Sequence, residues 1–170
     1  MKYPTNLVER LDFFRSQLKT RPTADLIEDA LNENLPHTRF AALSTGRATR
    51  EQYERALTDS DAGVRCKAIE YSRLTETQAA NALADEHYTV REAAVKSGRL
   101  NQQQLGIALQ DGHFVVRLEA VKTGGLSQEQ LDFAMNDEVH AVREAAAEAG
   151  GKSNLRGTLK NIVYRVRCLF

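Results

Sequence analysis

The sequence repeats itself every 26 residues, and this period restricts the chain to an array of equivalent units. The dipeptide Val-Arg recurs at Val64-Arg65, Val90-Arg91, Val116-Arg117 and Val142-Arg143, with Thr38-Arg39 one period earlier. Repeats of this length form stacked units, in which each unit completes the hydrophobic core of its neighbours. We therefore expect five copies between residues 23 and 150.

Other positions recur with the same 26-residue period, so the repeat does not rest on one dipeptide that could recur by chance. An acid precedes each arginine by six residues: Glu33, Asp59, Asp85, Asp111 and Asp137. Alanines flank the arginines at Ala30, Ala56, Ala82, Ala108 and Ala134, and at Ala42, Ala68, Ala94, Ala120 and Ala146. Small residues follow at Gly46, Ser72, Gly98, Gly124 and Gly150. Alanine at such positions favours close helix–helix packing.

Each copy reads as a helix, a turn and a second helix. The first helix begins at a capping column, which contains Thr23, Thr49, Thr75, Asn101 and Ser127. Four copies add a capping-box glutamine three residues later, at Gln52, Gln78, Gln104 and Gln130. The second helix carries Val-Arg in its first turn and ends at the small residue. The fold class we expect is all-α, a short right-handed α-solenoid of five 26-residue helix pairs in one domain.

The two ends depart from the repeat. Residues 1–22 predict an N-terminal capping helix that starts at Thr5, with one apolar side formed by Leu7, Val8, Leu11, Phe14 and Leu18. Residues 151–170 predict a C-terminal capping segment with bases and no acid: Lys152, Arg156, Lys160, Arg165 and Arg167. This segment is either an end cap with a solvated basic face or a basic amphipathic helix that docks on an acidic partner, nucleic acid or anionic lipid.

The segments LADEHYTVREAAVKSG (83–98) and LQDGHFVVRLEAVKTG (109–124) resemble HEAT-like repeats, through Leu-x-Asp followed by Val-Arg. The short period makes them more similar to the leucine-rich-repeat-variant (LRV) family. The resemblance covers residues 23–150 and implies a structural ladder of hydrogen bonds between repeats rather than a phosphate-binding stripe. The ladder residues would be Asp59, Arg65, Asp85, Arg91, Asp111, Arg117, Asp137 and Arg143.

A second basic column lies in the turns between one pair and the next. It contains Arg21, Arg47, Arg73 and Arg99. Consecutive members would lie about one helix-packing distance apart, roughly 10 Å, and such a line suits an acidic strip or a polyanion backbone. The alternative is that each base neutralises the negative end of the preceding helix.

An apolar edge gives a further candidate surface, formed by Phe40, Tyr88, Phe114 and Leu118. Aromatic and apolar anchors among charges are typical of protein-binding surfaces. Ordinary packing between repeats is the alternative reading of the same residues.

The sequence contains no pattern for catalysis, a cofactor or a metal site. It lacks G-x-S-x-G, a glycine-rich phosphate loop and H-E-x-x-H, and Cys66 and Cys168 fit no ligand spacing. His87 and His113 are one repeat apart, too distant to share a zinc ion, so we interpret them as turn residues. No apolar run has the length of a signal peptide or a membrane span, and we expect a cytoplasmic protein that is not an enzyme.

The leading functional hypothesis is a protein-binding scaffold, adaptor or inhibitor whose partner is another protein. The alternative is nucleic-acid binding, as in the HEAT-like DNA glycosylases, through the second arginine column and the basic C-terminus. Two features weigh against it: acids and bases balance at 23 each, and the chain lacks the Trp that those glycosylases use in their cleft. A resemblance to HEAT-like bilin lyases is a third and weaker option.

Overall fold

A computed structural model describes residues 3–151, which form helices and no strand. The all-α class is therefore confirmed. The chain divides into two compact units, Met1–Arg99 and Leu100–Phe170, and each is described by itself.

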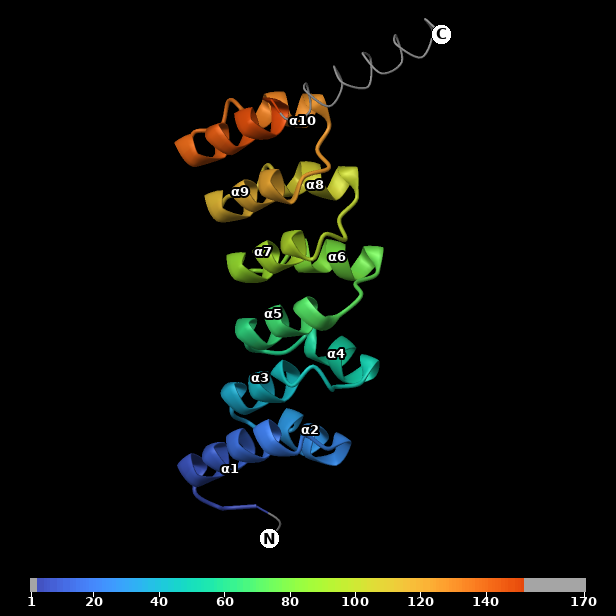
Figure 1. The fold of residues 1–170 in the computed structure, drawn as a ribbon, viewed down its shortest axis with the longest axis vertical. Helices are drawn as coiled ribbons and strands as arrows, with labels where there is room; N and C mark the ends of the chain where they lie inside the picture. The colour runs from blue at the N-terminus through green and yellow to red at the C-terminus, as the bar shows by residue number, and fades with distance from the viewer. Residues whose placement is uncertain (1–2, 152–170) are drawn as a thin grey trace, which may run out of the picture. The chain divides into compact units, whose positions relative to one another are not determined.

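The first unit contains seven labelled helices within its described residues (Figure 1). They are α1 (Leu7–Thr20), α2 (Ala24–Leu31), α3 (Pro36–Ser44), α4 (Arg50–Ala56), α5 (Ala62–Tyr71), α6 (Glu76–Leu83) and α7 (Tyr88–Lys96). In Figure 1, α1, α3, α5 and α7 follow one side of this unit, and α2, α4 and α6 follow the other. Each of α3, α5 and α7 packs against the first helix of its own pair, and α5 also contacts both α3 and α7.

The second unit repeats the helix–turn–helix pattern. Its described helices are α8 (Gln102–Ala108), α9 (Phe114–Thr123), α10 (Gln128–Ala134) and a helix over residues 140–151. Within this unit α8 packs against α9. The Gln102 side-chain amide donates to the Gly125 carbonyl, so the start of α8 is tied to the turn before α10.

The predicted capping column starts the first helix of every pair. The Thr49 hydroxyl accepts from the Gln52 amide at 3.3 Å, and Gln52 Oε1 accepts from the Thr49 amide at 2.8 Å. The same reciprocal box occurs at Thr75, Asn101 and Ser127, and Thr23 caps α2 through the Leu26 amide. These N-cap predictions are confirmed, because local side-chain bonds satisfy amides that have no partner within the helix.

The capping glutamine has a second role that the sequence pattern did not indicate. Gln52 Nε2 donates to Glu28 Oε2 at 2.7 Å, which links α4 to α2 of the preceding pair. In the second unit Gln130 Nε2 donates to the Gln102 carbonyl at 2.9 Å. Glutamate could form the capping box equally well, but only glutamine adds this donor. This second hydrogen bond accounts for glutamine at positions 52 and 130, whereas Gln78 makes only the capping box among the described residues.

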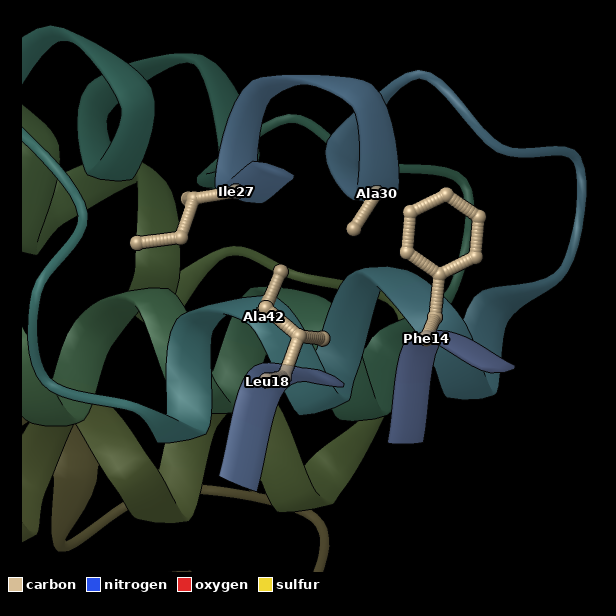
Figure 2. Packing of buried hydrophobic residues seen from close by; sticks show 5 residues of the cluster. All are labelled: Phe14, Leu18, Ile27, Ala30 and Ala42. Carbon is tan, nitrogen blue, oxygen red and sulfur yellow. The ribbon is translucent and has the colours of Figure 1, made fainter. Parts of the chain in front are cut away.

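Both alanine columns are buried. Figure 2 shows Ala30 of α2 and Ala42 of α3 in one cluster with Phe14 and Leu18 of α1 and Ile27 of α2. All five side chains are at most 4% exposed. Because alanine ends at Cβ, two helices can approach until their backbones nearly touch, and any larger side chain would force them apart.

Helix α1 starts one residue later than predicted. Asn6 is its N-cap, accepting from the amides of Val8 at 2.8 Å and Glu9 at 3.4 Å, so the prediction of Thr5 is wrong. Leu7 and Val8 do not belong to a buried face, since they are 61% and 68% exposed. Both lie in the first turn, before the helix reaches the core cluster around Phe14.

Tyr3 packs beside α1, against the core cluster around Phe14. Its ring centroid lies 5.4 Å from that of Phe13 and 5.0 Å from that of Phe14. The Tyr3 hydroxyl also donates to the Asp29 carboxylate of α2. Aromatic packing and one hydrogen bond therefore anchor the start of the described chain.

The small-residue column ends the second helix in four copies as predicted, at Gly46, Ser72, Gly98 and Gly124. Gly46, Gly98 and Gly124 have φ values of 68°, 64° and 81°, in the left-handed region that favours glycine. Gly46 has a further constraint, because an added Cβ would stand 3.2 Å from the Tyr71 ring. The prediction is wrong at Gly150, since the last described helix continues through it. A helix interior accepts glycine at modest cost.

Thr38 occupies the column that holds buried valine in the other repeats, and its hydroxyl has no hydrogen-bond partner among the described residues. Thr38→Val removes this unsatisfied group at constant shape, so we expect the free energy of unfolding to rise by about 1 kcal/mol in urea titrations. The control Val64→Thr places a hydroxyl in the equivalent buried position and should lower it. A loss of stability in Thr38→Val would contradict this account.

Gln52→Glu keeps the capping box but removes the donor to Glu28 and adds a like charge beside it. We expect the free energy of unfolding to fall by about 1–2 kcal/mol. Gln78→Glu is the matched control, since the Gln78 side-chain amide has no donor contact in the described structure, and its change should stay near zero. Equal losses in both variants would show that the bridge to the preceding pair contributes nothing.

Candidate partner-binding surface

Arginines of the second helices bridge consecutive helix pairs. Arg65 of α5 binds the Asp85 carboxylate through two parallel bonds, Nε to Oδ2 and Nη2 to Oδ1, each 2.8 Å long. Equivalent bridges join Arg39 to Asp59 and Arg117 to Asp137. Such bidentate pairs are strong and directional, so they define the position of each turn relative to the preceding helix.

The same guanidinium groups also hold their own turns. Nη1 of each ladder arginine donates to the backbone carbonyl six residues earlier: Arg39 to Glu33, Arg65 to Asp59, Arg91 to Asp85, Arg117 to Asp111 and Arg143 to Asp137. These distances are between 2.6 and 2.9 Å. These guanidinium groups therefore hold the turn of their own pair, and those of Arg39, Arg65 and Arg117 also hold the next turn.

The acid of the ladder has a matching double role. Asp137 accepts from Arg117 and also from the backbone amide of Val139 at 2.8 Å. The Arg117 hydrogen bonds hold the pKa of the Asp137 carboxyl below its usual range, against burial, which raises it. Both side chains are nearly buried, at 8% and 7% exposure, so ionisation of this pair is coupled to folding.

The second arginine column is exposed throughout, as expected for either reading. Within residues 3–151 the side chains of Arg21, Arg47, Arg73 and Arg99 enter no ion pair. Arg21 and Arg47 line one groove of the first unit, whereas Arg73 and Arg99 do not line it. The column thus separates into two residues that share a concavity and two that do not.

This groove, the α1–α3 groove, has a volume of about 1060 Å³. The end of α1, the turn after it and the exposed side of α3 form its walls. Its basic lining residues are Arg15, Lys19, Arg21 and Arg47, and its apolar ones include Leu11, Leu18, Phe40 and Ala41. No acid occurs among its lining residues in the described structure. Arg15 and Lys19 were not identified from the sequence, because neither belongs to a repeated column.

Phe40 extends the surface from the groove onto α5. Its side chain is 40% exposed, and Lys67 Nζ lies 5.1 Å from its ring centroid and 5.7 Å from that of Tyr71. Tyr71 itself stacks on Tyr53, with centroids 5.6 Å apart and planes at 10°. Tyr71 was not identified from the sequence, because no other repeat has an aromatic residue at this position.

The remaining candidates are not among the lining residues of the groove. Tyr88 is exposed at the start of α7 and stacks on His87, whereas Phe114 and Leu118 belong to α9 of the second unit. Phe114 is exposed and Leu118 is half-buried. The predicted basic residues Lys160, Arg165 and Arg167 lie outside the described residues.

Comparisons with known proteins add no family: a scan against protein-family models and a search of curated proteins both found no match. No helix within residues 3–151 combines the length and apolarity needed to cross a bilayer. Over the same range, no three His, Cys, Asp or Glu side chains are grouped so that they could hold a metal ion. The α1–α3 groove is therefore the feature from which a function can be argued.

Asp137→Asn keeps the side-chain shape and the acceptor for the Val139 amide but removes the charge that faces Arg117. We expect a loss of about 1–3 kcal/mol in the free energy of unfolding near neutral pH. Because the folded-state pKa of Asp137 is depressed, its contribution is present above the unfolded pKa of about 3.9 and disappears as the pH falls through the folded value. The stability difference between wild type and variant should therefore shrink on acidification.

Urea titrations across this pH range measure that difference. Asp132→Asn is the control, because Asp132 is exposed and its carboxylate contacts only Gln128 among the described residues. A difference for Asp137→Asn that stays constant with pH would contradict the proposed coupling.

Proposed function

We propose that this chain is a non-enzymatic protein-binding scaffold, an adaptor or inhibitor, built as a short right-handed α-solenoid of HEAT-like or LRV-like helix pairs. Bridges that link residues 20 positions apart support this architecture, since the same contact recurs from one pair to the next. In a stacked array the inner columns serve packing, and the exposed columns remain available to a partner.

The α1–α3 groove is the observation that carries the binding function. It combines exposed arginine and aromatic side chains, which are enriched at the centres of protein interfaces. Its volume lies at the upper end of small-ligand sites, and one side of it is open to solvent, which suits an extended segment of a protein. The ladder acids and arginines are engaged in structural contacts, which supports a role for them in the scaffold.

Nucleic-acid binding is the second candidate, favoured by the cations of the groove that lack an ion pair. Charge weighs against it, because residues 3–99 carry 14 Lys and Arg against 15 Asp and Glu. A unit without net positive charge gains little long-range attraction for a phosphate backbone. The apolar floor of the groove also offers nothing to a phosphate. We therefore favour a protein partner over a nucleic acid. We also propose that this binding takes place in the cytoplasm.

Affinity capture with the full chain, after nuclease treatment and at physiological salt, tests this function. We expect defined protein partners to be enriched and to survive nuclease, because apolar contacts contribute beside charge. A salt titration with duplex DNA runs in parallel and should show weak binding. Capture of no protein, together with tight DNA binding that falls steeply with salt, would contradict the scaffold and support the alternative.

A further inference from the structure

We propose that the α1–α3 groove docks an acidic amphipathic segment of a partner protein. The carboxylates of this segment would face Arg15, Lys19, Arg21 and Arg47, and its apolar side chains would cover the floor. This inference rests on the proposed scaffold function and adds the location of the site and the chemistry of the partner.

The charge of the groove indicates an anionic ligand. Its lining gathers four cations and no acid, and within residues 3–151 none of the four side chains forms an ion pair. Arg10 and Arg55 of the same unit pair with Glu33 and Glu28. Arg73 and Arg99 also lack an ion pair among the described residues, but they do not line the groove. Like charges that share a concavity repel one another, and an incoming anionic group relieves that repulsion.

The apolar lining of the groove indicates that the ligand also has apolar side chains. Phe40 is exposed, and Leu11 and Ala41 are only half-buried, so part of the apolar lining of the groove stays in contact with water. A purely ionic ligand such as a phosphate backbone would leave this surface uncovered. A peptide with Leu, Ile or Phe between its acids would cover it and gain the free energy of apolar burial.

Other occupants fit less well. The segment 152–170 of this chain carries five bases and no acid, so it has the same sign of charge as the groove. A second copy of the chain could present acids, since residues 100–151 carry eight acids and three bases. Self-association through the groove would depend on protein concentration, which separates it from binding to another protein.

The test begins with selection of random short peptides, displayed on phage, against the full-length chain. We expect the enriched peptides to carry several Asp or Glu beside Leu, Ile or Phe, and a synthetic copy to bind in fluorescence anisotropy. The double variant Arg21→Glu/Arg47→Glu should weaken that binding by more than about tenfold. Phe40→Ala should weaken it while leaving its salt dependence unchanged, because Phe40 contributes no charge.

The double variant Arg73→Glu/Arg99→Glu is the matched control. It makes the same charge change in the same repeat column, at exposed residues outside the groove, and should alter binding by less than about twofold. Circular dichroism and thermal unfolding check that both variants fold. If Arg21→Glu/Arg47→Glu unfolds, Arg15→Glu/Lys19→Glu takes its place, since both of those residues lie on the exposed side of α1.

Several results would overturn the docking site. They are enriched peptides without acids, no enrichment at all, equal weakening by the control variant, tighter groove-dependent binding of a DNA duplex, or a dimer that the groove variant abolishes. Affinity capture from a lysate shows whether only the docking site is wrong or the scaffold function is wrong as well. If the groove variant captures the same proteins as wild type, only the groove assignment fails; if neither captures a protein, the scaffold fails too.

Discussion

The bidentate bridge between an arginine of one helix pair and an aspartate of the next is the contact on which the fold depends. The helices are 7 to 14 residues long, too short to be stable alone in water. Arg65 holds its own turn through a carbonyl and the following turn through Asp85. A nearly buried guanidinium needs such partners, since an uncompensated buried charge would destabilise the folded state.

Two further constraints act at the same interfaces. The alanine columns let the backbones approach closely, and capping glutamines such as Gln52 add a donor to the preceding pair. These contacts use the repeated positions of the described chain for structure. Residues available for binding therefore lie outside these structural columns. They include Phe40, Arg15 and Lys19, and also Arg21 and Arg47 of the exposed arginine column.

The groove lies at the N-terminal end of the repeat, between α1, which is not part of a helix pair, and α3. This helix is longer than those of the pairs and packs on both α2 and α3. Its buried face ends in Phe14 and Leu18, while Arg15 and Lys19 follow these residues in sequence and are exposed at the groove. Burial of one face of α1 thus leaves Arg15 and Lys19 exposed, and they line the groove together with residues of α3.

The sequence alone determined the helical class, the N-caps of the helix pairs, the buried alanine columns and the acid–arginine columns. These features follow from short spacings and a fixed period, which a helix translates directly into faces and contacts. It did not reveal Asn6 as the cap of α1, the unsatisfied Thr38 hydroxyl, the second bond of Gln52 or the α1–α3 groove. Only the three-dimensional structure decided these. The cap of α1 depends on which of two neighbouring residues meets the helix amides, and the other three depend on how helices distant in the sequence pack together.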